Sequence, residues 1–167
     1  TENISVEHKK VQTAYFDVKS RLLVLPIWKH MNNDITDLLI SHEVGHALFT
    51  PQSGWEKSVI EKKIPKSFLN VIEDARIEKL IKRKYPGLSQ SFIRGYRDLI
   101  KNDFFGTKDK DVNELLLIDR LNIHFKSSHV ESPLTFTDTY ESDVISRIEK
   151  LETFEQVVDL ADELAKY

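Results

Sequence analysis

The segment His42-Glu43-Val44-Gly45-His46 constrains this chain more than any other, because it places two histidines four residues apart in a pattern typical of a helix. Residues at this spacing lie on one face of a helix, so both imidazoles can reach the same metal ion. Glu43 follows the first histidine, where its carboxylate can act as general base on a water at the metal. Gly45 leaves space beside the histidines for a close neighbour. We therefore expect His42 and His46 to be metal ligands and Glu43 to be catalytic.

The residues around this motif predict a buried helix from Asp34 to Thr50. Asp34 or Thr36 can serve as the N-cap, and Pro51 with Gly54 ends the segment. Apolar residues occupy much of its circumference: Ile35, Leu38, Leu39, Ile40, Val44, Ala47, Leu48 and Phe49. Polar side chains on such a helix cost free energy unless they have partners, and metal coordination would supply them. The alternative is a core helix whose histidines bond to the backbone.

Composition limits the classes of protein that fit. The length of 167 residues suits a single domain, and a net charge of -3 gives no reason to expect nucleic-acid or membrane binding. The absence of cysteine excludes disulfides and thiolate zinc sites, and favours a reducing, cytoplasmic location. The longest apolar run, Leu22 to Trp28, is too short to span a bilayer. Because the chain begins at Thr1 and its only methionine is Met31, we expect it to be excised from a longer protein, with another domain or subunit as a partner.

The coarse pattern predicts an α+β fold that is mostly helical, with a small N-terminal sheet. Residues 13–27 read as two short strands with a turn near Lys19-Ser20-Arg21, and Pro26 marks the second as an edge strand or as ending there. An edge strand before the histidine helix could pair with an extended peptide, or could simply pack on that helix. We expect one domain over residues 1–167, with the metal-site core in 13–88 and a helical part in 89–167.

The remaining segments are expected to be helices joined by polar loops. A loop or partial helix covers residues 52–65, and a polar loop covers 126–139. Helices are predicted for Phe68 to Lys84, Ser89 to Lys101, Val112 to Phe125, Asp143 to Leu151 and Phe154 to Tyr167. Asp111 with Glu114 and Thr153 with Gln156 have the spacing of capping boxes.

A third metal ligand is needed, because a catalytic zinc usually has three protein ligands and an open fourth position. The other histidines are candidates: His8, His30, His124 and His129. Three acids and an arginine also interrupt the apolar pattern of the helix from Phe68 to Lys84: Glu73, Asp74, Arg76 and Glu78. We predict Glu73 as the third ligand, with Asp74 as the alternative, and the other acid as acceptor for a histidine N–H. Glu78 is expected to form an ion pair, while Arg76 could pair structurally or contact substrate.

The stretch His42-Glu-Val-Gly-His-Ala-Leu-Phe-Thr50, followed by Asn70-Val-Ile-Glu-Asp-Ala-Arg-Ile-Glu78, resembles the zincin metallopeptidases of the gluzincin type. More narrowly, residues 13–88 are similar to peptidase-like segments of bacterial and phage proteins that carry a von Willebrand A domain, including cobaltochelatase-subunit-like proteins. The resemblance implies a zincin-like fold with one zinc ion held by His42, His46 and Glu73. The chain departs from that pattern at Ile77, where gluzincins have an acid, and in the longer distance between the two motifs.

The resemblance implies a zinc-dependent hydrolysis of polypeptide substrates, with Glu43 moving the proton of the attacking water. The oxyanion of the reaction needs a donor, and Tyr85, Arg94, Tyr96 and His124 are candidates, of which we favour Tyr96. One alternative is a zincin scaffold that keeps zinc but serves as a protein-interaction module. A metal-free helical interaction domain would leave the buried acids and histidines without an explanation, and a nuclease lacks the expected basic patch.

Overall fold

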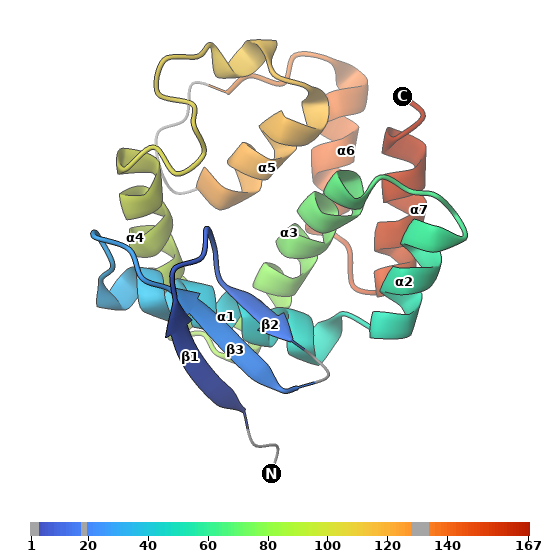
Figure 1. The fold of residues 1–167 in the computed structure, drawn as a ribbon. Helices are drawn as coiled ribbons and strands as arrows, with labels where there is room; N and C mark the ends of the chain where they lie inside the picture. Colours follow the sequence, from blue (N-terminus) through green and yellow to red (C-terminus); the bar gives the residue numbers. More distant parts are fainter. Residues whose placement is uncertain (1–3, 18–19, 128–133) are drawn as a thin grey trace.

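The computed structural model describes residues 4–17, 20–127 and 134–167, and in these ranges the chain forms an α+β fold with a small sheet and seven α-helices. Figure 1 shows the sheet and α1 (Asn33–Phe49) at one end of the molecule and α5 (Leu117–Ser127) and α6 (Thr139–Glu149) at the other. Between them runs α3 (Lys66–Lys84), which contacts α1, α5, α6 and α7 (Phe154–Leu164). The predicted α+β class, dominated by helices, is confirmed.

The sheet has three strands in the order β1 (Ser5–Lys9), β3 (Leu22–Pro26), β2 (Tyr15–Asp17). The two predicted strands pair antiparallel as β2 and β3, while the turn expected near Lys19 lies partly at residues 18–19, outside the described residues. Pro26 ends β3, but β3 is the central strand and β2 is an edge. The sequence did not indicate β1, because its residues are exposed and lack apolar alternation.

Two hydrophobic cores flank α3. The first lies between the sheet, α1 and α4 (Leu88–Lys101), and includes Leu23, Leu25, Ile35, Leu38, Phe92 and Leu99. The helices α1 and α4 approach closely at Gly95, where an added Cβ would lie 2.8 Å from Leu38 Cδ1. The second core joins α3 to α5, α6 and α7, and includes Leu69, Ile72, Leu121, Val144, Ile148 and Val157. The acids of α3 therefore lie at the junction of two apolar cores.

Several helix ends differ from the prediction. Asn32, rather than Asp34 or Thr36, caps α1 by accepting from the backbone N–H of Ile35. The partial helix expected within 52–65 is α2 (Gln52–Ile60). The helix predicted from Val112 to Phe125 is divided into a 3-10 turn, η1 (Val112–Glu114), and α5.

The last two helices depend on their caps. Asp138 caps α6 by accepting from two backbone N–H groups, so this helix begins at Thr139 rather than at Asp143. The predicted capping box of Thr153 and Gln156 is present at α7, which ends at Leu164.

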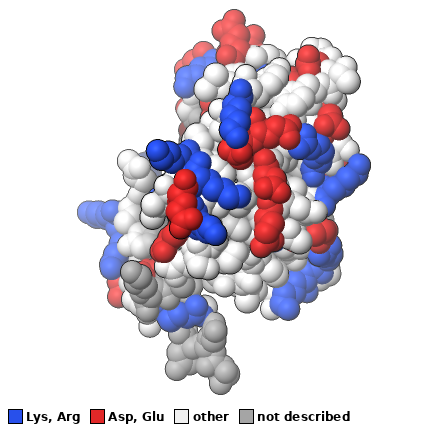
Figure 2. Space-filling view, turned by 90° about the vertical axis from the view of Figure 1, so that its right-hand side faces the viewer, with Lys and Arg blue, Asp and Glu red and all other residues white. Residues whose placement is uncertain are grey.

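The distribution of surface charge and the character of the helices are relevant to nucleic-acid and membrane binding, neither of which was expected. Figure 2 shows acidic and basic side chains lying next to one another on the face at the right of Figure 1. Among the described residues, no helix combines the length and the apolar character that crossing a membrane requires.

Candidate metal centre

The helix α1 presents His42 and His46 on one face, with their ring centroids 4.9 Å apart. This arrangement follows from the four-residue spacing, as the sequence predicted. Gly45 lies between them against α3, where an added Cβ would come within 3.0 Å of Ile77 Cδ1. The missing side chain lets α1 approach α3 closely, and this approach brings the histidines to the acids of α3.

His42 is oriented by a buried carboxylate. Its Nδ1 lies 3.0 Å from Glu78 Oε1, and the same oxygen accepts a hydrogen bond from the hydroxyl of Tyr96. Burial raises the pKa of Tyr96 well above its usual value, and the charge of Glu78 adds to this, so the hydroxyl stays protonated. Because an ionised carboxylate only accepts, Nδ1 of His42 donates and Nε2 points toward Asp74 Oδ1 at 3.5 Å.

His46 is oriented through a hydroxyl. Thr50 donates its hydroxyl hydrogen to Glu73 Oε1, and its oxygen lies 3.0 Å from His46 Nδ1. A hydroxyl has one hydrogen, so Thr50 must accept from Nδ1–H of His46. The Nε2 of His46, on the side of the ring away from Thr50, lies 3.1 Å from Asp74 Oδ1. Both histidines thus direct Nε2 toward the same carboxylate.

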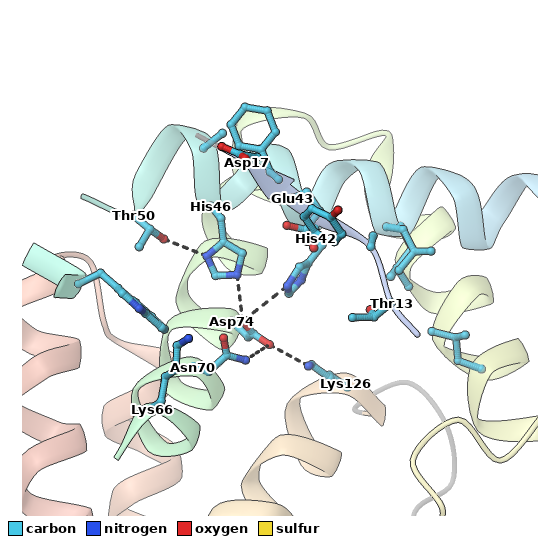
Figure 3. A pocket seen from close by; sticks show the side chains of 18 of the residues that line it. Thr13, Asp17, His42, Glu43, His46, Thr50, Lys66, Asn70, Asp74 and Lys126 are labelled. Atoms are coloured by element: carbon cyan, nitrogen blue, oxygen red, sulfur yellow. Dashed lines mark hydrogen bonds and ion pairs between the residues drawn. The ribbon is translucent and has the colours of Figure 1, made fainter. Parts of the chain in front are cut away.

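Asp74 lies next to both histidines, and the three residues together form a group of possible metal ligands. Its Oδ1 faces both Nε2 atoms, and its Oδ2 accepts from Lys126 Nζ at 2.9 Å and from Asn70 Nδ2 at 3.3 Å (Figure 3). One ligand atom from each of His42, His46 and Asp74 lies within 4.8 Å of the others. Burial alone would raise the pKa of Asp74, but Lys126 and the histidines outweigh it and hold the pKa far below its usual range. Asp74 therefore presents an ionised carboxylate to the two histidines.

Glu73, predicted as the third ligand, lies elsewhere. Its carboxylate is fully buried against Arg76, whose Nε and Nη2 donate to it at 2.8 and 2.7 Å. Neighbouring residues on a helix point about 100° apart, so only one of Glu73 and Asp74 can face the histidines. The structure brings Asp74 to them. Glu73 instead acts on His46 indirectly, through Thr50.

The two other charged residues of α3 have clear partners. Besides Glu73, Arg76 donates to the backbone oxygens of Phe49 at 2.8 Å and Glu152 at 3.1 Å. It is buried, so the structural role that the sequence left open for it is the one observed. Glu78 was expected to form an ion pair, and its partner is His42 on α1.

The remaining histidines do not join the group in the described part of the chain. His8 and His30 are exposed, and His124 packs edge-on against Phe125 and Phe136. His129 lies outside the described residues.

The group opens onto a cavity of about 700 Å³. Its lining includes His42, Glu43, His46, Asp74 and Lys126, together with residues 13–17 of the sheet. Figure 3 shows Glu43 beside His42 on α1, with Thr13 and Asp17 on the sheet side of the cavity. A molecule in this cavity could therefore touch the carboxylate of Glu43 and the three converging ligand atoms together.

Sequence reasoning missed two residues of the site. Thr50 follows His46 by four residues on α1, and this helical spacing was a signal that could have identified it. Lys126 lies 52 residues beyond Asp74, in a segment predicted to be a loop, and no local pattern pointed to it.

The donor set fits zinc. Two imidazole nitrogens and one carboxylate oxygen are a common ligand set for a catalytic zinc, and each histidine has an acceptor for its other nitrogen. Comparison of the chain with protein-family models, curated proteins and solved structures found no match in any of the three.

Zinc binding should release a proton from His42. Burial alone lowers the pKa of His42, but the charges of Asp74 and Glu78 raise it to about 9. A ligand imidazole must be neutral, so near pH 7.5 binding should displace about one proton from this ring, and affinity should fall about tenfold for each pH unit below 9. Calorimetry in buffers of different ionisation enthalpy measures this release. Heats independent of the buffer near pH 7.5 would contradict the prediction.

Proposed function

We propose that this chain is a zinc metallopeptidase with a zincin-like site, in which His42, His46 and Asp74 hold one zinc ion and Glu43 is the general base. The observation that carries the proposal is the convergence of two Nε2 atoms and one Oδ1 within 4.8 Å, beside a glutamate in an open cavity. A bound zinc would polarise a peptide carbonyl and lower the pKa of a water to about 7. A purely structural zinc would need neither the glutamate nor the cavity.

In the proposed hydrolysis, one residue transfers the proton and others orient the metal ligands. Glu43 accepts the proton of the attacking water on its carboxylate and passes it to the nitrogen of the leaving amine. Glu78 and Thr50 fix the rings of His42 and His46 through their Nδ1 atoms. Because these partners are held by Tyr96 and Glu73 in turn, the rings need little reorganisation during the reaction.

The residues that line the cavity support a polypeptide as substrate. The edge strand β2 lines it, and an extended peptide could add to this edge by backbone hydrogen bonds. Apolar side chains line another part of it: Leu38, Leu39, Leu99, Phe104 and Phe105. This part could receive an apolar side chain of the bound peptide.

The proposal is tested by metal removal. The purified protein is treated with a chelator, dialysed, and assayed on casein and on a mixture of quenched fluorescent peptides, before and after zinc is restored. We expect hydrolysis by the untreated protein, loss after chelation, and recovery with about one equivalent of zinc.

Hydrolysis that resists chelation would contradict the proposal. Tight binding of zinc without hydrolysis of any peptide would instead favour the protein-interaction module with a non-catalytic zinc.

A further inference from the structure

Peptide hydrolysis by this site needs a donor for the oxyanion, and each candidate suggested by the sequence either donates to another residue or does not line the cavity. The hydroxyl of Tyr96 donates to buried Glu78. Arg94 makes two hydrogen bonds of 2.9 Å to Asp34 on the far part of α1. The other two, Tyr85 and His124, do not line the cavity in the described part of the chain.

Lys126 places a hydrogen-bond donor beside the converging ligand atoms, which these candidates do not. It lies in the last turn of α5, and its side chain is 16% exposed. Its Nζ is 2.9 Å from Asp74 Oδ2, while the Oδ1 of the same carboxylate faces the two histidines. Figure 3 shows Lys126 reaching Asp74 from the side opposite α1. The ammonium is therefore one carboxylate group away from the point where the three ligand atoms converge.

Lys126 lines the cavity and has donors beyond the one that it gives to Asp74. An ammonium has three N–H groups, and the bond to Asp74 uses one of them. A cation that is mostly shielded from solvent interacts strongly with a negative charge that develops beside it.

We propose that Lys126 is a further catalytic residue, whose ammonium donates a hydrogen bond to the oxyanion of the tetrahedral intermediate while Asp74 Oδ2 holds it in place. This inference rests on the proposed peptidase function. The water oxygen bonds to the carbonyl carbon, and the π pair of the carbonyl moves onto its oxygen. Lys126 stabilises that charge without giving up its proton, which distinguishes its role from that of Glu43.

The test compares Lys126→Met and Lys126→Arg with the wild type, and uses Lys101→Met, an exposed lysine at the end of α4, as the matched control. Zinc per chain, kcat and KM are measured, together with the affinity for a dipeptide phosphonamidate, a tetrahedral anionic analogue of the intermediate. We expect Lys126→Met to keep its zinc, to lose about 10²–10³-fold in kcat, and to lose affinity for the phosphonamidate by a similar factor. The KM should change less than about threefold, and Lys126→Arg should recover part of the rate.

Three results would overturn the inference. Unchanged kcat and phosphonamidate affinity in Lys126→Met would show that the ammonium does not touch the oxyanion. Loss of zinc in this variant would show that Lys126 serves only to hold Asp74. A wild type with neither zinc nor peptidase activity would overturn the proposed function as well, so the two failures are distinguishable.

Discussion

Replacing Glu43 by glutamine is expected to lower the rate of peptide hydrolysis by about 10²–10⁴-fold while leaving the bound zinc in place. Glutamine keeps the size of the side chain but cannot accept a proton at its amide. Glu43 is not one of the three converging ligand atoms, so its replacement leaves His42, His46 and Asp74 intact. Steady-state kinetics and elemental analysis of the same preparation measure both quantities.

Glu155→Gln, which makes the same change at an exposed position on α7, is the matched control and should hydrolyse peptides at the wild-type rate. A Glu43→Gln variant that retains most of the wild-type kcat would contradict the assignment of the general base. In that case the zinc site would remain, and another group lining the cavity would have to take the proton.

Replacing Glu73 by alanine is expected to reduce the free energy of unfolding by about 3–5 kcal/mol, because it leaves Arg76 charged and buried without its carboxylate. Glu73 is fully buried, and Arg76 is 3% exposed. Arg76 also donates to the backbone of Phe49 and Glu152, so the change loosens the end of α1 and the start of α7. Chemical denaturation measures the effect.

The double substitution Glu73→Leu with Arg76→Met removes both charges and keeps apolar volume, so it should recover much of the lost stability. The folded fraction of Glu73→Ala should still bind zinc, with an affinity weakened by about 10–100-fold through the loss of the acceptor for Thr50. A Glu73→Ala variant as stable as the wild type would contradict the structural role of the pair.

Local sequence patterns predicted most of the helices. Long apolar segments mark the helices α1 and α3, one-sided apolar periodicity marks α7, and the four-residue spacing of His42 and His46 fixes their common face. In contrast, β1 was missed because its place depends on parallel pairing with β3, a contact between distant residues that leaves no alternation in an exposed strand.

The choice between Glu73 and Asp74 could not be made from the sequence. Both acids lie on a helix that is buried on most of its surface, so the apolar pattern does not reveal how the helix is rotated relative to α1. The contact of Gly45 with Ile77 sets that rotation and turns Asp74 toward the histidines. Lys126 depends on the docking of α5 against α3, which local sequence does not specify.

The zinc content of the protein and its variants shows whether His42, His46 and Asp74 bind a zinc ion. Elemental analysis of protein purified without chelator should find about one zinc per chain in the wild type and in Glu73→Gln, and little in His46→Ala and Asp74→Ala. Absence of zinc from the wild type after reconstitution would show that these three residues do not form a zinc site. Zinc that stays in Asp74→Ala but leaves with Glu73→Gln would return the third ligand to Glu73.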